Sequence, residues 1–436
     1  MRSFEVTGGA RLHGAIIPQG AKNEALQILC AVLLTPEEVV VHNVPDIVDV
    51  RQMLSLLDEL GIDVQPLGTG SWKFRAATIR LERMTEVAFH EKANRLRGSV
   101  MIAGPLLARF GKSFIPRPGG DKIGRRKMDT HVLGLEKLGV KAEYDAGMGC
   151  FHLSVDKLSG NYILLDEPSV TGTANIVMAA VMAVGHTTIY NAACEPYLQQ
   201  LCRMLNKMGA SIKGIGSNLL EIDGVSALHG TDHRILPDMI EVGSFIGMAA
   251  ITGSDIRIRN AGVEHLGIIP DKFRQLGINM HIEGDDIHIP SQGEYDIQDN
   301  MDGSILTIYD HPWPGLTPDL LSILLVVATQ ATGSVLIHQK MFESRLFFVD
   351  KLIDMGARII LCDPHRATVI GLEKKQALRG ITMNSPDIRA GMALLIAAMS
   401  AEGRSIIHNI EQIDRGYQHL DKRLNALGAK IRRIES

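Results

Sequence analysis

Six segments of the chain are apolar at nearly every position, which is typical of helices buried on all sides. A short strand is predicted after each of them. The apolar segments are NEALQILCAVLL, GSVMIAGPLLA, TANIVMAAVMA, VGSFIGMAAI, PDLLSILLVVA and RAGMALLIAAM. The predicted strands are EVVVHNV, KSFIPRP, HTTIYNA, SDIRIRN, GSVLIHQ and RSIIHNI.

A second kind of helix follows each strand, and it ends at a glycine that leads directly into further strands. Glycine at this point fits a helix C-cap, because it adopts the left-handed conformation without steric cost. The six segments include LSLLDELGIDVQ, LGLEKLGVKAEY and VDKLIDMGARIIL. The glycines are Gly61, Gly139, Gly209, Gly277, Gly356 and Gly428.

The chain therefore contains six α/β repeats of roughly 70 residues, longer than the period of about 20–50 residues typical of solenoids. Strands mixed with helices predict an α/β fold in which helices cover sheets. Three repeats per domain, with buried helices inside and strands outside, suit the length of 436 residues. The break between domains is expected near LHGTDHRILPD, residues 228–238. Periodicity alone leaves the arrangement of the repeats open.

Composition is that of a globular protein, with 45% hydrophobic and 22% charged residues. The net charge of −4 gives no overall basic field, so neither nucleic acid nor an anionic membrane is an expected partner. The five cysteines are scattered without a C-x-x-C pair, which argues against a disulfide framework or structural zinc. The N-terminal stretch lacks the apolar core of a signal peptide. We expect a cytoplasmic protein.

The familiar phosphate-loop, dinucleotide, zinc-protease and serine-hydrolase motifs are absent from the sequence, so it implies neither a metal nor a nucleotide cofactor. Polar residues instead occupy the starts of the apolar helices and two turns. Those at helix starts are Lys22, Asn23, Arg97, Ser169, Val170, Asp319, Asp387 and Arg389, and those in turns are Arg345 and Arg415.

These residues allow a structural and a functional interpretation. Asp, Ser and Asn are good N-caps, and a single arginine is usually a surface charge. Arg97 and Arg389, however, lie near helix N-termini, where the helix dipole disfavours a cation. Several helix starts with cations beside them would bind a small, multiply charged anion such as a phosphorylated carboxylic acid.

Five cations within the segment SFIPRPGGDKIGRRKMD, together with Lys112 just before it, crowd around Asp121. Pro-Gly-Gly is an ordinary turn signal, so the segment could be a solvated hairpin with Asp121 as a counter-ion. Alternatively, the carboxylate is placed where a substrate meets a cluster of cations. The residues alone leave both interpretations open.

Over essentially its whole length, the sequence resembles the UDP-N-acetylglucosamine enolpyruvyl transferases. The motifs that carry the resemblance are GAKNEAL, LRGSVMIAGPLLARFG, PGG-x-x-IGRR, D-x-HVLGLEKLG, SVTGTANIVMAA, NAACEP, LPDMIEVGSF, FESR, DIRAGMALLIAA and IDRGY. The resemblance implies a two-domain inside-out α/β barrel with three repeats per domain. Residues 22–235 would form one domain with a catalytic loop at about 112–127, residues 1–21 and 236–436 the other, and the active site would lie in the cleft between them.

The implied reaction transfers the enolpyruvyl group of phosphoenolpyruvate to the 3′-hydroxyl of UDP-N-acetylglucosamine and releases phosphate. In this family it is the first committed step of peptidoglycan precursor synthesis, on which cell shape and division depend. The family uses no metal or organic cofactor. Such a reaction needs a general acid and a general base, together with fixed cations for the phosphate and carboxylate.

The resemblance also implies roles for individual residues. Asp121, Lys22, Asp319 and Arg415 would be catalytic, with Asp319 as the base for the 3′-hydroxyl. The residues implied to hold phosphoenolpyruvate are Lys22, Asn23, Arg126, Arg345, Arg389 and Arg415. Those implied to hold the nucleotide sugar are Asn23, Arg97, Arg126, Lys127, Met128, Asp129, Thr130, Ser169, Val170, Asp319 and Met341.

The sequence departs from the family pattern in places. Thr317-Pro318-Asp319 replaces the usual Pro-Thr-Asp, Lys127 stands where proline is common, and Glu167 stands where a lysine can occur. The largest departure is Asp121, where many members carry the cysteine that fosfomycin alkylates. A carboxylate is a much poorer nucleophile than a thiolate, so the chain is expected to be insensitive to fosfomycin.

Two rival functions remain at this point. One is that of 5-enolpyruvylshikimate-3-phosphate synthase, which resembles this fold and chemistry, but its Gly-Asn-Ser-Gly-Thr type motif is replaced here by RLRGSVM. The other is a non-catalytic protein that senses UDP-N-acetylglucosamine. Retention of Lys22, Asp121, Asp319 and the arginines argues against a sensor, which needs neither acid nor base.

Overall fold

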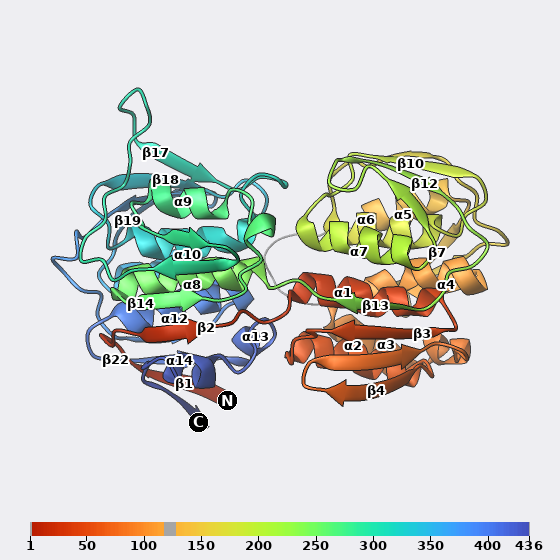
Figure 1. Cartoon of the computed structure of the whole chain (residues 1–436), viewed down its shortest axis with the longest axis horizontal. Coiled ribbons are helices and arrows are strands. Elements are labelled where there is room, and N and C mark those ends of the chain that lie inside the picture. The colour runs from red at the N-terminus through yellow and green to blue at the C-terminus, as the bar shows by residue number, and fades with distance from the viewer. Residues whose placement is uncertain (1, 117–127, 436) are drawn as a thin grey trace. The chain divides into compact units, whose positions relative to one another are not determined.

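The computed structural model of the chain describes residues 2–116 and 128–435. The described residues form two compact units (Figure 1). The N-terminal unit contains residues 20–116 and 128–236, and the C-terminal unit contains residues 2–19 and 237–435. The chain therefore passes from one unit to the other at residues 19–20 and again at residues 236–237.

Three sheets belong to the N-terminal unit. Two of them mix parallel with antiparallel pairing, and the three-stranded sheet is antiparallel throughout. The first has the order β13 (Thr231–Arg234), β3 (Glu38–His42), β5 (Ser71–Arg75), β4 (Asp63–Gly68). The second has the order β6 (Lys112–Ile115), β8 (Cys150–Ser154), β7 (Lys141–Asp145). The third has the order β11 (Ser211–Lys213), β12 (Leu219–Asp223), β10 (His186–Tyr190), β9 (Tyr162–Leu164).

Three four-stranded sheets belong to the C-terminal unit, and strands from the beginning of the chain complete two of them. One has the order β15 (His281–Glu283), β16 (Asp286–Ile289), β14 (Asp255–Ile258), β2 (His13–Ile16). The next has the order β17 (Leu306–Tyr309), β18 (Ser334–His338), β20 (Arg366–Ile370), β19 (Arg358–Asp363). The last has the order β21 (Thr382–Asn384), β22 (Arg404–His408), β1 (Arg2–Thr7), β23 (Ile431–Glu435).

The six apolar segments form the helical core, as the pattern predicted. In the C-terminal unit, α8, α10 and α12 pack on one another between the strands (Figure 1). Most of their side chains are fully buried, and each buried large aliphatic side chain stabilises the fold by about 1.5–3 kcal/mol. The central helices are α1 (Lys22–Ala31), η3 (Arg97–Ile102) with α4 (Ala103–Phe110), α6 (Val170–Ala180), α8 (Met239–Thr252), η5 (Pro318–Leu320) with α10 (Leu321–Ala328), and α12 (Ile388–Ser400).

The predicted glycine-terminated helices are also present, and all six glycines have positive φ, between 86° and 108°. At the first of them, the amides of Gly61 and Ile62 donate to the carbonyls of Asp58 and Leu57, which closes the helix end. These helices are α2 (Val48–Glu59), α5 (Asp129–Lys137), α7 (Pro196–Lys207), α9 (Ile269–Gln275), α11 (Val349–Asp354) and α14 (Leu420–Asn425).

The remaining short helices join these elements. They are α3 (Val87–Arg95), α13 (Glu411–Asp414), η1 (Val32–Leu34), η2 (Leu81–Thr85) and η4 (Val263–His265). Within the described ranges, every helix is too short or too polar to cross a membrane.

Candidate active site

Asp319 of the C-terminal unit lies between two arginines. It belongs to the short helix η5, which is capped by Thr317 and leads into α10. Its Oδ1 is 2.5 Å from Nη2 of Arg345, and its Oδ2 is 3.3 Å from Nε of Arg389. The two arginine side chains are only 9% and 6% exposed. A half-buried carboxylate paired with two fixed guanidinium groups brings a proton acceptor and two anion-binding cations to one place.

Arg389 is held on its other side by the phenol of Tyr417, to which Nη1 donates at 3.3 Å. The phenol oxygen also lies 3.2 Å from the hydroxyl of Ser244 in α8. Burial disfavours the charge on Arg389, but Asp319, Tyr417 and Asp238 together outweigh this effect, so the pKa of Arg389 is raised. Burial raises the pKa of Tyr417 as well, so the phenol stays protonated beside its cation. Arg389 is therefore a permanently charged group in a fixed position.

The N-terminus of α12 shows how Arg389 is accommodated there. Asp387 caps the helix by accepting hydrogen bonds from the amides of Arg389 and Ala390, at 2.7 and 3.0 Å. The structural interpretation of Asp387 as an N-cap is confirmed. The cap and the pairing with Asp319 offset the unfavourable helix dipole, which explains why this arginine departs from the local preference.

A buried acid, Asp310, fixes the turn that follows β18. It lies just after the parallel neighbour β17 and accepts hydrogen bonds from the amides of Lys340 and Met341, at 2.5 and 3.1 Å. The side-chain amide of Gln339 donates to the same carboxylate. Burial raises the pKa of Asp310, and these backbone bonds oppose the rise. This turn leads on to Arg345, so Asp310 fixes the segment that precedes Arg345.

Arg415 comes from the same unit, directly after the short helix α13. Its Nη1 donates to Oε1 of Gln412 at 3.0 Å, and its side chain is half-buried. It follows β22, whereas Arg345 follows β18 and Asp319 precedes α10. Two successive strand–helix repeats of the unit thus contribute to the predicted anion-binding residues.

In the N-terminal unit, Lys22 begins α1 and forms a buried ion pair with Asp49. The Nζ and Oδ2 atoms are 2.7 Å apart, and the two side chains are 10% and 3% exposed. Asp49 lies in the first turn of α2, where the helix dipole favours a carboxylate. The pair therefore fixes the ammonium group of Lys22 next to Asn23 at the start of the central helix.

Three further helix starts of this unit carry the residues expected to bind the nucleotide sugar. Arg97 opens η3, Asp129 and Thr130 open α5, and Ser169 caps α6 by accepting from the amide of Gly172 at 3.2 Å. The Thr130 hydroxyl donates to Oδ1 of Asp166 at 3.0 Å, and this bond ties α5 to the segment that enters α6.

Comparison with known proteins places this geometry in a family. Residues 6–424 match the EPSP synthase (3-phosphoshikimate 1-carboxyvinyltransferase) family. The chain is 64% identical over 434 residues to the UDP-N-acetylglucosamine 1-carboxyvinyltransferase of Bacteroides thetaiotaomicron, with all of both chains covered. It is 63% identical over the same length to the enzyme of that name from Porphyromonas gingivalis, again with full coverage. The chain belongs to the UDP-N-acetylglucosamine 1-carboxyvinyltransferases. These enzymes are enolpyruvyl transferases, so the sequence-based resemblance is confirmed.

Solved structures agree on the fold. The enolpyruvyl transferase NikO from Streptomyces tendae superposes with a TM-score of 0.88 at 21% identity, covering 100% of this chain and 99% of that one. EPSP synthase from Acinetobacter baumannii superposes with a TM-score of 0.74 at 18% identity, with full coverage of both. The mixed α/β fold of this chain is thus that of the enolpyruvyl transferases.

The predicted site residues of the chain fall into three groups. Asp121, Arg126 and Lys127 lie outside the described residues. The C-terminal unit brings Asp319, Arg345 and Arg389 into direct contact and carries Arg415 and Met341. The N-terminal unit carries Lys22, Asn23, Arg97, Met128, Asp129, Thr130, Ser169 and Val170.

Sequence reasoning missed three residues that hold the predicted ones. Asp49 forms an ion pair with Lys22, and Asp310 accepts a hydrogen bond from the amide of Met341. The neutral phenol of Tyr417 accepts a hydrogen bond from Arg389 and holds it in place. Two of the three carry a signal in the sequence. Tyr417 lies within the family motif IDRGY, and Asp49 lies in the first turn of the helix that follows a strand, where a carboxylate is favoured. Asp310 has no local signal, because its partners lie about 30 residues further along.

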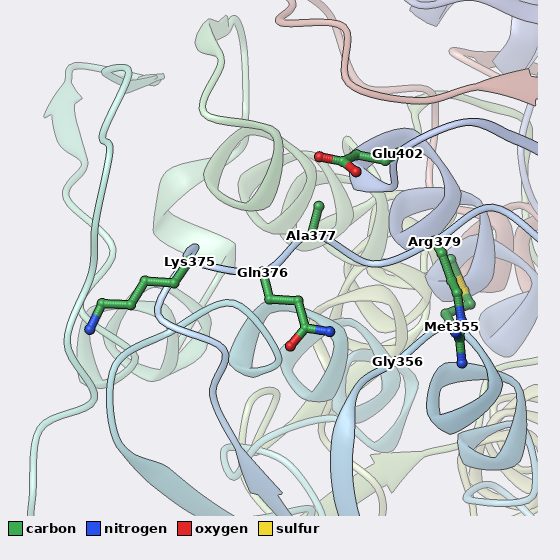
Figure 2. Close-up of a pocket in the computed structure, with 7 residues that line it drawn as sticks. All are labelled: Met355, Gly356, Lys375, Gln376, Ala377, Arg379 and Glu402. Atoms are coloured by element: carbon green, nitrogen blue, oxygen red, sulfur yellow. The ribbon is translucent and has the colours of Figure 1, made fainter.

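A surface pocket elsewhere in the C-terminal unit contains none of these residues (Figure 2). It is lined by Met355, Gly356, Lys375, Gln376, Ala377, Arg379 and Glu402. The Arg379 side chain donates to the carbonyl of Asp354, a bond that fixes the pocket wall. Among residues 2–116 and 128–435, no group of three or more His, Cys, Asp or Glu side chains is arranged to hold a metal ion.

Proposed function

We propose that this chain transfers the enolpyruvyl group of phosphoenolpyruvate to the 3′-hydroxyl of UDP-N-acetylglucosamine and releases phosphate. The observation that carries the proposal is the half-buried carboxylate of Asp319 between the buried side chains of Arg345 and Arg389. The reaction requires a base for a hydroxyl next to cations for a phosphate and a carboxylate. The close, full-length similarity to enzymes named for this reaction supports the same assignment.

The chemistry follows from these groups. The 3′-oxygen bonds to C2 of the enol while C3 gains a proton, and the hydroxyl proton passes to Asp319. The C2–O bond to phosphate then breaks, C3 loses a proton, and the enolpyruvyl ether remains. Positive charge at C2 is stabilised by nearby carboxylates, and the anionic groups are stabilised by arginines. Asp121 is the proposed proton donor to C3.

Arginine pairing makes Asp319 a poor base until the substrate arrives. Two guanidinium groups beside a carboxylate stabilise its charged form and reduce its tendency to take a proton. When phosphoenolpyruvate draws Arg345 and Arg389 towards its own anionic groups, the carboxylate becomes more basic. The proposed order is therefore that the anion binds to the arginines before Asp319 accepts the hydroxyl proton.

The remaining residues divide between the two substrates. Lys22, Asn23, Arg126 and Arg415 complete the set proposed to hold phosphoenolpyruvate, and the helix starts of the N-terminal unit hold the nucleotide sugar. The backbone near Met341 joins the second set, positioned by Asp310. Together with this activity we propose the family's usual architecture, in which each of two α/β barrels contains three repeats.

The test is phosphate release from phosphoenolpyruvate in the presence of UDP-N-acetylglucosamine. We expect turnover in the wild type, and a decrease in kcat of about 10²–10⁴-fold in Asp319→Asn, the range for loss of a general base. Asp271→Asn is the matched control, since Asp271 is an exposed carboxylate of the same unit, paired with Arg274. Undiminished turnover in Asp319→Asn would contradict the assigned base.

The same assay separates the rivals. Phosphate release that depends on shikimate 3-phosphate would indicate the EPSP synthase reaction, and binding of UDP-N-acetylglucosamine without turnover would indicate a sensor. The 64% identity to enzymes named for the first reaction, against 18% to a solved EPSP synthase, favours the first. With this activity we also propose a role in peptidoglycan precursor synthesis. Because Asp121 stands where many family members carry cysteine, we further propose insensitivity to fosfomycin.

A further inference from the structure

Asn175 is a fully buried amide in the middle of the apolar helix α6. Its side-chain oxygen accepts a hydrogen bond from the amide of Gly104 at 2.6 Å. Its side-chain nitrogen donates to the carbonyl of Val100 at 3.1 Å. Both partners lie where the helix η3, which begins at Arg97, gives way to α4. The side-chain amide of Asn175 thus fixes η3 and α4 to one position along α6.

Gly104 shows how close this approach is. A Cβ atom at that position would collide with the backbone and side-chain oxygens of Asn175. A side chain at position 104 would therefore push η3 and α4 away from α6. Gly104 allows the close contact, and the side-chain amide of Asn175 fixes where η3 and α4 lie along α6. Asn175 therefore sets the position of Arg97, the first residue of η3, relative to α6.

The same amide reaches a third element through His131 of α5. The side-chain nitrogen of Asn175 lies 3.2 Å from Nδ1 of His131, and Nε2 of His131 lies 3.1 Å from the hydroxyl of Thr171. Burial, and to a smaller extent Arg97, lowers the pKa of His131 to about 3, so the ring is neutral at physiological pH. His131 immediately follows Thr130, so the bond also sets the start of α5.

These bonds determine the tautomer of His131. The Asn175 oxygen is used by the amide of Gly104, which orients the NH₂ group towards the imidazole. Since NH₂ only donates, Nδ1 must accept and carry no proton. A neutral ring then has its proton on Nε2, which donates to Thr171. The whole chain of bonds runs in one direction, from α6 to α5 and back to the first turn of α6.

We propose that Asn175 is a positioning residue for the nucleotide-sugar part of the site. It joins the three helices whose first residues are Arg97, Asp129–Thr130 and Val170, and it sets their spacing through Gly104, Val100 and His131. The proposal rests on the proposed function, because that function assigns these three helix starts to UDP-N-acetylglucosamine. No atom of Asn175 needs to touch the substrate.

The test compares Asn175→Asp with a matched control. Aspartate keeps the shape and the acceptor for Gly104 but loses both donors, so a carboxylate oxygen then faces the Val100 carbonyl. We expect the KM for UDP-N-acetylglucosamine to rise about tenfold, while the KM for phosphoenolpyruvate changes little. Asn206→Asp is the control: Asn206 also bridges a backbone amide and carbonyl, both of Ile212, and has no hydrogen bond to the three helix starts. It should give no such split.

A spectroscopic readout tests the network without relying on activity. Nitrogen-15 NMR of the wild-type protein should show His131 neutral, with the proton on Nε2, down to pH 5. In Asn175→Asp the new carboxylate should favour the imidazolium and raise the His131 pKa. A proton on Nδ1 in the wild type would overturn the proposal even if the variant failed to fold.

The outcomes distinguish failure of the proposed function from failure of the positioning role of Asn175. Absence of wild-type turnover with UDP-N-acetylglucosamine would refute the proposed function and leave the NMR result to decide the hydrogen-bond network. Normal wild-type turnover, with Asn175→Asp raising both KM values equally or lowering kcat alone, would refute the positioning role. The same selective KM change in Asn206→Asp would refute it as well.

Discussion

The buried pair of Lys22 and Asp49 gives the sharpest stability prediction. At 2.7 Å and an effective dielectric constant of about 20, the attraction between two unit charges is about 6 kcal/mol. Much of this offsets the cost of removing both ions from water, but deleting one partner of such a pair costs about 3–5 kcal/mol because the other charge stays buried. Asp49→Asn keeps the size and one acceptor oxygen of the side chain, so we expect the lower value of about 3 kcal/mol.

Calorimetry measures this loss as a shift in melting temperature. For a unit of about 200 residues, 1 kcal/mol corresponds to roughly 2–4 °C, so the transition that includes the N-terminal unit should fall by about 6–12 °C. Glu86→Gln is the control in the same unit, since it removes the acid of an exposed pair with Arg83. It should melt close to the wild type, because exposed pairs contribute little.

Inorganic phosphate should reverse the defect if Lys22 is an anion-binding residue. In the wild type, phosphate must compete with Asp49 for the ammonium group, whereas in Asp49→Asn it supplies the missing negative charge. Phosphate at 100 times its Kd stabilises a protein by about 2.7 kcal/mol, which would recover most of the loss. An unchanged melting temperature in Asp49→Asn would refute the energetic argument, and equal phosphate shifts in both proteins would refute the competition.

Further predictions concern three acids. Asp121→Asn should abolish most turnover, and Asp121→Cys should become sensitive to fosfomycin; covalent labelling of the wild-type loop by the drug, seen by mass spectrometry, would contradict this. Asp319→Asn should lower kcat more than it raises either KM, as steady-state kinetics can show. Burial raises the pKa of Glu195 at the start of α7 to about 7, opposed by backbone hydrogen bonds, and its Oε2 has no partner among the described groups. Because the folded state holds this proton more tightly, its contribution of ~3 kcal/mol is present below pH 4.5 and is lost as the pH rises to about 7. Glu195→Gln should flatten this part of the stability profile measured by urea unfolding.

Much of the fold could be predicted because its determinants are local. All-round apolarity predicted the central helices, and a glycine after each amphipathic helix predicted its end, which all six positive φ angles confirm. The arginine that departs from the helix-dipole preference, Arg389, is paired with Asp319, and its role in a functional site stays a prediction. The boundary of the fifth helix was less accurate: Asp319 lies in the 3₁₀ turn η5 ahead of α10, because Pro318 follows the capping Thr317.

The supporting residues could not be predicted, because their partners are brought close only by folding. Asn175 sits in an apolar run in which a single amide gives no periodic signal, and its partner Gly104 lies 71 residues earlier. Asp310 likewise acts on the amides of a turn 30 residues away. A buried polar residue in an otherwise apolar helix is the general clue, since it must find a partner or destabilise the fold. The clue identifies the residue but not what it holds.

Two buried glutamates occupy the same position in two of the six repeats. Glu24 and Glu241 are each the third residue of a central helix, α1 and α8, and both side chains are 0% exposed. Glu24 accepts from the amide of Leu236, and Glu241 accepts from the amide of Gln19. Each therefore ties the start of a central helix to a segment where the chain leaves or enters the same unit. The equivalent positions predict equivalent structural roles.

The basic side chains that pair with these two glutamates differ, and this difference follows from the surrounding chain rather than from the repeat. Glu24 lies 2.8 Å from Nε2 of His233 in β13, whereas Glu241 lies 2.6 Å from Nη1 of Arg423 in α14. Burial raises the pKa of Glu241, and Arg423 opposes the rise with a charge that is independent of pH. One imidazole nitrogen thus contacts Glu24, whereas both terminal nitrogens of a guanidinium donate to Glu241. Repetition thus conserves the backbone contact, while the choice of partner decides its chemistry.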